Sequence, residues 1–119
     1  MATEDQHLSQ FLHNSEVAQR LATLADYDWA VTALFYGGLH LTEAYLVRRG
    51  VFAETHVQRE RQMLMLPELG SMIDSYRTLR DYSEDARYEC RRFSQQEFEV
   101  IRDVFTDLVN RVQALRGTN

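Results

Sequence analysis

The sequence predicts an all-α fold, an antiparallel up-and-down four-helix bundle with one short extra helix. Apolar residues recur at spacings of three and four over four long segments, which is the period of a helix with one buried face. The 119 residues contain only one proline and five glycines, and runs of β-branched residues are few, so helix is favoured over strand. An antiparallel bundle buries such apolar faces most economically, and the length predicts a single domain over residues 1–119.

Two long helices are predicted in the first half of the chain. Residues 5–24 carry an amphipathic pattern, and residues 27–49 are apolar around most of the helix circumference, as expected at the centre of a bundle. Gly37 and Gly38 each cost about 1 kcal/mol of helix stability relative to alanine, so we expect a neighbouring helix or a partner to approach closely there. The expected buried positions of the first helix are Leu8, Leu12, Ser15, Ala18 and Ala22.

A short helix and a third long helix follow. Thr55 and Gln58 have the spacing of a capping box, which predicts a short helix over residues 56–65. Pro67 then interrupts the helical pattern. A third long helix is predicted over residues 71–88, and its expected buried positions are Met72, Tyr76, Leu79, Ser83 and Ala86.

The last helix has the clearest amphipathic pattern in the chain. Ser94 and Glu97 form a second predicted capping box, directly before it. Gly117 is expected to end it. Its predicted buried positions are Phe98, Ile101, Phe105, Leu108, Val112 and Leu115.

The composition excludes several classes of protein. A single cysteine, Cys90, allows no internal disulfide and no CxxC zinc site, which favours a reducing compartment and hence a cytoplasmic location. No apolar run approaches the roughly 20 residues that span a bilayer, and the polar, acidic N-terminus is unlike a signal peptide. Because 18 acidic and 13 basic residues give a net charge of −5, any contact with nucleic acid must come from a local patch.

Every basic residue is arginine, so Schiff-base chemistry by lysine is excluded and proton transfer falls to a histidine, a carboxylate or a tyrosine. His7 and His13 lie on different faces of one helix, which predicts exposed surface histidines and a poor metal pair. His40 lies inside the apolar central helix and shares a face with Tyr36 and Glu43. These three residues are interpreted as a satisfied core network or, alternatively, as a polar pocket or a polar self-association interface.

His56 is the candidate for proton transfer. It lies at a predicted helix start, with Arg59 three residues after it and Arg49 seven residues before it. Metal-independent phosphodiester cleavage uses such a set, because imidazole moves a proton near neutral pH and guanidinium binds phosphate in bidentate fashion. The alternative is a helix-start histidine that packs on the neighbouring loop.

A third candidate is a group of arginines between residues 77 and 92. Arginine beside exposed aromatic rings suits single-stranded RNA, because bases stack on the rings while guanidinium groups hold phosphates. Asp81 and Asp85 lie in the same stretch, so a salt-bridged solvated face is the alternative. The members of the group are Arg77, Arg80, Arg87, Arg91 and Arg92, interleaved with Tyr76, Tyr82, Tyr88 and Phe93.

The order of these features resembles the HEPN family (higher eukaryotes and prokaryotes nucleotide-binding), in its small stand-alone bacterial and archaeal form, over about residues 8–115. The mix of small, aromatic and polar residues over 26–46 is similar to a helix of that family. The Arg49-Gly50 helix end, followed by Thr55-His56, resembles the family's connection into the next helix. The third similar stretch is Tyr76, Leu79, Ser83 and Ala86-Arg87-Tyr88.

The resemblance implies a bundle of four to five helices, often a homodimer with a cleft between protomers. Many members are metal-independent ribonucleases of toxin–antitoxin or antiviral defence systems, whose signature is an arginine, four to six residues and a histidine. Arg49 and His56 have this spacing and are the expected catalytic pair. The substrate, RNA or a nucleotide, is expected to contact Arg59, Arg87, Tyr88 and His40, with no metal or cofactor. The alternative is a non-catalytic interaction module that partners a nucleotidyltransferase or an antitoxin.

Overall fold

The computed structural model describes residues 1–117, which form helices and their connections and no strand, so the predicted fold class is confirmed. Four long helices and one short α-helix are present, with a 3-10 turn after the short helix. The elements are α1 (Glu4–Thr23), α2 (Tyr27–Arg48), α3 (His56–Met65), η1 (Pro67–Met72), α4 (Ile73–Tyr88) and α5 (Gln95–Gly117).

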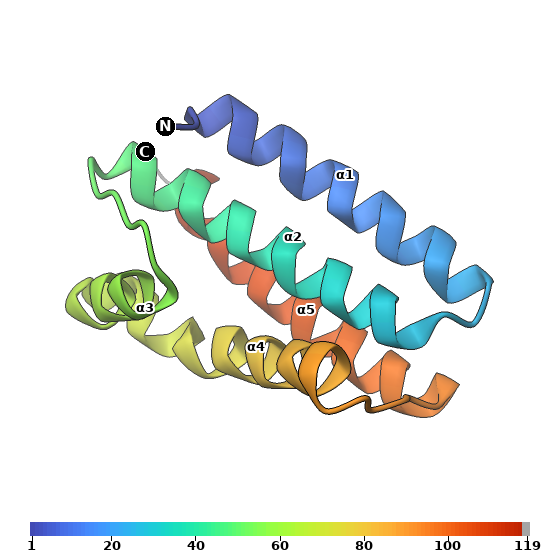
Figure 1. The fold of residues 1–119 in the computed structure, drawn as a ribbon. Coiled ribbons are helices and arrows are strands. Elements are labelled where there is room, and N and C mark those ends of the chain that lie inside the picture. Colours follow the sequence, from blue (N-terminus) through green and yellow to red (C-terminus); the bar gives the residue numbers. More distant parts are fainter. Residues whose placement is uncertain (118–119) are drawn as a thin grey trace.

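Consecutive long helices run in opposite directions, and α2 packs against α1, α4 and α5 (Figure 1). The start of α1 and the end of α5 therefore lie at one end of the bundle. Glu4 joins them, because its carboxylate pairs with Arg48 at 3.0 Å and with Arg116 at 3.1 Å. Within residues 1–117, none of the helices combines the length and the apolar character that crossing a bilayer requires.

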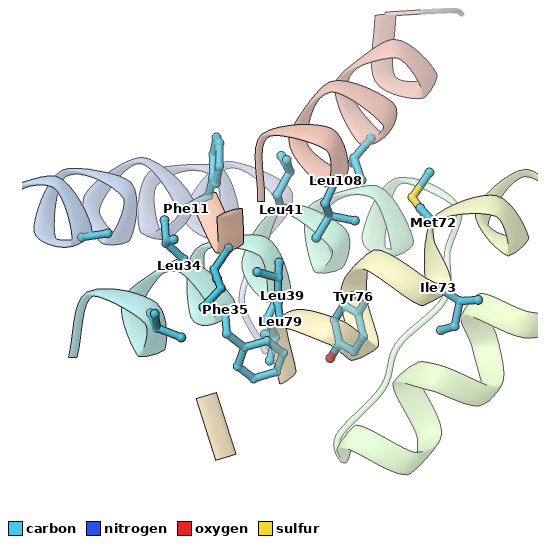
Figure 2. Close-up of a cluster of buried hydrophobic side chains, with 14 of the residues drawn as sticks. Phe11, Leu34, Phe35, Leu39, Leu41, Met72, Ile73, Tyr76, Leu79 and Leu108 are labelled. Carbon is cyan, nitrogen blue, oxygen red and sulfur yellow. The ribbon is translucent and has the colours of Figure 1, made fainter. Parts of the chain in front are cut away.

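The core is built around α2, most of whose residues are buried. Leu34 and Phe35 of α2 lie among side chains from α1, α4 and α5 (Figure 2). Tyr76 of α4 is fully buried, and its ring meets Phe35 edge to face with the ring centroids 5.6 Å apart. Apolar burial on all sides of α2 explains why its sequence pattern lacks a polar face.

Gly38 lies where α5 crosses α2. A Cβ at this position would lie 2.9 Å from a methyl group of Leu108, and one at Gly37 would lie 3.4 Å from the ring of Phe105. The predicted close approach is confirmed, and the approaching element is a helix of the same chain.

The predicted helix caps are present. The backbone N–H of Glu97 donates to Ser94 Oγ, and the N–H of Ser94 donates to the Glu97 carboxylate, which completes a capping box. Thr55 caps α3, because its hydroxyl accepts from the N–H of Gln58 at 3.1 Å. The Gln58 side chain accepts instead from the N–H of Glu54, one residue before the predicted position.

Three sequence expectations at the level of elements were wrong. Leu12 is 60% exposed, and Phe11 lies in the core in its place, although the predicted positions Leu8, Ala18 and Ala22 do pack against the core. Trp29, predicted as part of the apolar central helix, is also largely exposed. The third long helix begins at Ile73 instead of residue 71, since Pro67 opens a 3-10 turn that lasts until Met72.

Candidate functional site

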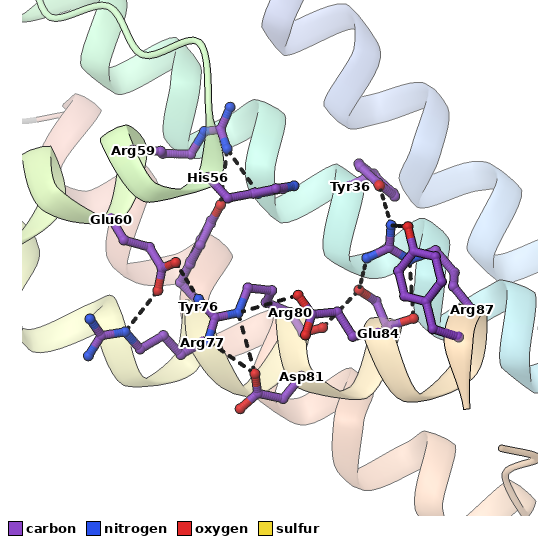
Figure 3. Close-up of polar contacts among 12 residues, drawn as sticks. Tyr36, His56, Arg59, Glu60, Tyr76, Arg77, Arg80, Asp81, Glu84 and Arg87 are labelled. Atoms are coloured by element: carbon purple, nitrogen blue, oxygen red, sulfur yellow. Dashed lines mark hydrogen bonds and ion pairs between the residues drawn. The ribbon is translucent and has the colours of Figure 1, made fainter. Parts of the chain in front are cut away.

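Arg59 forms the centre of a polar cluster between α2, α3 and α4 (Figure 3). Its side chain is buried and forms an ion pair with Glu43 of α2. A second guanidinium nitrogen lies 3.5 Å from the hydroxyl of Tyr76 and 3.2 Å from His56 Nδ1. Burial alone would lower the pKa of Arg59, but Tyr76 and Glu43 outweigh it and raise the pKa, so Arg59 stays charged. The cluster thus holds a buried, fully partnered cation.

His56 is placed by the first turn of α3, three residues before Arg59, and it is exposed. Its ring lies against Phe35, with the centroids 5.9 Å apart. Partial burial, followed by the charges of Arg59 and Arg87, lowers the pKa of His56 below its usual value, so the ring is neutral at pH 7. Since a guanidinium can only donate, His56 Nδ1 must accept from Arg59, and the ring proton lies on Nε2. His56 therefore offers solvent a hydrogen-bond donor.

Arg87, near the end of α4, pairs with tyrosines and with no carboxylate among residues 1–117. Its guanidinium donates to the Tyr36 hydroxyl at 2.7 Å and lies over the ring of Tyr88, 4.9 Å from the centroid. The same side chain donates to the hydroxyl and the carbonyl oxygen of Ser83. Tyr88 is 70% exposed. A positive charge therefore lies between aromatic rings at the surface, without a neutralising acid (Figure 3).

The other arginines of this group are in ion pairs. Glu60 of α3, which is buried, accepts from Arg77 at 2.8 Å and also pairs with Arg80. Arg91 bridges Asp85 at 3.1 Å and Glu97 at 2.9 Å. The salt-bridged interpretation is confirmed for these arginines. Arg92 is 85% exposed in its side chain and reaches Asp28 at 3.4 Å.

Arg49 and His56 have separate partners. The guanidinium of Arg49 forms an ion pair with Glu68 and lies 3.3 Å from the hydroxyl of Tyr45, whereas His56 contacts Arg59 and Phe35. Arg59 joins His56 as the sequence spacing predicted, but within residues 1–117 no hydrogen bond or ion pair joins Arg49 to that cluster.

His40 is half-buried, and its partner is His7 of α1, with the two Nδ1 atoms 3.0 Å apart. Neither Tyr36 nor Glu43 forms a hydrogen bond with His40. The Tyr36 hydroxyl accepts from Arg87 instead, and the Glu43 carboxylate accepts from Arg59. The prediction that His7 is exposed is therefore wrong. The first turns of α1 lie along the second half of α2, and this packing cannot be read from the periodicity of α1 alone.

Sequence reasoning missed two partners at the site. The sequence predicts Tyr76 as a buried residue and as one of the aromatic rings beside the arginines, and it predicts His7 only as a surface residue. Their bonds to Arg59 and His40 were not predicted. No local pattern marks them, because their partners lie on other helices. Among the described residues, no group of three or more His, Cys, Asp or Glu side chains is placed to hold a metal ion.

Comparison with known proteins shows the fold. No protein-family model matches the chain, and no curated protein matches it. A solved structure, that of TT1696 from Thermus thermophilus, is similar with a TM-score of 0.77 and 22% sequence identity. The similarity covers 96% of this chain and 98% of that one. The bundle is thus a fold found in an experimental structure over nearly its whole length.

Proposed function

We propose that this chain is a HEPN-like module that binds RNA or a nucleotide, without cleaving it, on the face formed by α2, α3 and α4. The single observation that carries the proposal is Arg87, whose charge no carboxylate among residues 1–117 neutralises and which lies between Tyr36 and Tyr88. An exposed aromatic ring beside a guanidinium without an acid suits a base that stacks and a phosphate that pairs. The Nε2–H donor of His56 supplies a further contact for a phosphate oxygen.

Binding is favoured over cleavage by the contacts of His56 and Arg49. A general base needs a free lone pair, but the one lone pair of neutral His56 accepts from Arg59 at 3.2 Å. Arg49 is neutralised by Glu68, so it has little charge left for a developing phosphorane. Both groups are better suited to positioning and hydrogen bonding than to proton transfer.

A binding experiment tests the role of Arg87. Fluorescence anisotropy with a labelled single-stranded RNA is expected to show binding that Arg87→Ala weakens at least about tenfold, as does Tyr88→Ala. Arg92→Ala removes one positive charge at an arginine that is 85% exposed and pairs with Asp28; it is the control for loss of charge and is expected to change affinity by less than about threefold. Equal weakening by Arg92→Ala and Arg87→Ala would show that affinity depends only on the net charge of the protein, which would overturn the proposed site.

A cleavage assay tests the non-catalytic part of the proposal. Pure protein incubated with labelled RNA in EDTA is expected to leave the RNA intact, for the wild type and for His56→Ala alike. Cleavage by the wild type that both His56→Ala and Arg49→Ala abolish would instead favour the ribonuclease alternative, with Arg49 and His56 as its catalytic pair.

Self-association and partner binding belong to the same proposal, because the HEPN resemblance implies a homodimer and, in some members, a nucleotidyltransferase or antitoxin partner. Light scattering of the pure protein tests the homodimer: a molar mass of twice the 14.0 kDa of one chain is the expected result. A mass of one chain at all concentrations would remove the homodimer from the proposal.

A further inference from the structure

A cavity on the other side of Arg59 is separate from the proposed RNA face. It has a volume of about 390 Å³ and lies between the start of α1, the second half of α2 and the connection before α3. Its apolar lining includes Leu39, Val47 and the half-exposed Phe52. The two imidazoles of His7 and His40 line it as well, and they also line a shallower hollow beside it. The volume is within the range of small-molecule sites.

The two imidazoles share one hydrogen. Their Nδ1 atoms are 3.0 Å apart and their ring centroids 5.3 Å apart, so one Nδ1 must donate and the other must accept. Burial lowers the pKa of both rings, and the charge of Arg59 adds to this while Glu43 opposes it at His7. Both rings are therefore neutral at pH 7.

The hydrogen bond between the two Nδ1 atoms determines which Nε2 atom of the pair can donate to a ligand and which can accept. The ring that donates through Nδ1 keeps a lone pair on Nε2, and the ring that accepts carries its proton on Nε2. Within residues 1–117 neither Nε2 atom has a hydrogen-bond partner, and neither is buried without one. One donor and one acceptor are thus available next to an apolar wall.

The charged groups of the cavity do not favour an ion. Arg59 and Glu43 both line it, but they neutralise one another in a buried ion pair. Glu54 and Met1, which carries the terminal ammonium, also line the cavity and are of opposite charge, so an ionic ligand would gain no net attraction there. A neutral ligand avoids the cost of desolvating a charge.

We propose that this cavity binds a small, uncharged, planar molecule that presents a hydrogen-bond donor and an acceptor side by side, as a primary amide or a lactam on a flat ring does. The amide edge pairs with the Nε2 atoms of His7 and His40, and the ring packs against Leu39, Val47 and Phe52. This site goes beyond the proposed RNA-binding function and does not depend on it.

Benzamide is a suitable probe, and benzoate is its anionic control of nearly the same shape. In an NMR titration, benzamide is expected to shift the ring resonances of His7 and His40 saturably, with a dissociation constant of about 1 mM or below. Benzoate is expected to bind at least about tenfold more weakly. Equal binding of the two, or no saturable shift up to the solubility of benzamide, would overturn the proposal.

Variants locate the site and control for folding. His40→Phe, which keeps a planar ring without the polar atoms, is expected to weaken benzamide binding at least about tenfold. His7→Gln retains a donor and an acceptor and is expected to weaken binding less than His7→Phe. His13→Phe changes an exposed histidine of the same helix and is the matched control. Unchanged binding in His40→Phe would place benzamide elsewhere and refute the site, whereas loss of RNA binding in Arg87→Ala with benzamide binding intact separates the two proposals.

Discussion

At the scale of single residues, the buried Glu43–Arg59 pair is the contact on which the site depends most. Both side chains are less than one tenth exposed, so removal of one charge leaves the other buried without compensation. Glu43→Gln is expected to lower the free energy of unfolding by about 3 kcal/mol, as measured by chemical denaturation. Glu84→Gln, at a half-exposed acid 3.9 Å from Arg80, is the matched control and is expected to cost less than about 1 kcal/mol. Similar losses in the two variants would contradict a special role for the buried pair.

The same residues show how far a sequence predicts a site. The spacing of Tyr36, His40 and Glu43 placed all three on one face of a helix, and the spacing of His56 and Arg59 placed them together in the first turn of α3. His56 and Arg59 do meet, but the partners of Tyr36, His40 and Glu43 lie 16 to 51 residues away along the chain, as for Glu43 with Arg59 and Tyr36 with Arg87. Helical periodicity carries no information on such contacts, because they depend on how the helices are rotated against one another.

At the scale of elements, the crossing of α2 and α5 depends on Gly38. A leucine side chain there would occupy the space of the Leu108 methyl group, which lies 2.9 Å from the position of a Cβ. Gly38→Leu is expected to lower the free energy of unfolding by about 3 kcal/mol, because a packed core tolerates added volume poorly. Gly70→Leu, where nothing lies within 4 Å of a Cβ, is the control. Since the contact lies within one chain, light scattering is expected to show no change in molar mass, and a change would instead place Gly38 at an interface between copies.

The helices themselves were largely predictable, because each carries its own signals of period, start and end. The cap of Ser94 and Glu97, the glycine after α2 and the apolar face of α5 are all local features. The wrong predictions concern residues whose burial depends on contacts with a neighbouring helix. The exposure of Leu12 and the burial of Phe11 depend on the helices that α1 meets, among them α5, whose Phe105 ring centroid lies 6.3 Å from that of Phe11.

At the scale of the whole molecule, several arginines link helices to one another through shared carboxylates. Glu60 accepts from two arginines, and Glu4 pairs with two arginines from different helices. The planar guanidinium presents several donors in fixed directions, so one carboxylate can hold two helices together. This network neutralises most of the cations between residues 77 and 92, and among the described residues it leaves Arg87 as the charge of that group without an acid.

The histidines give the whole fold a dependence on pH. Burial holds the pKa values of His7, His40 and His56 below their usual value of 6.5, so below about pH 6.5 the unfolded chain binds more protons than the folded one. This contribution to stability is complete above that pH and is lost as the pH falls through it. The melting temperature is therefore expected to fall between about pH 7.5 and pH 5.5. Protonation of both His7 and His40 would also break their shared hydrogen bond, so His7→Gln is expected to flatten the profile, with His13→Gln as the control for the change of side chain. A melting temperature that stays constant or rises over this interval would show that these rings titrate alike in the folded and unfolded chains.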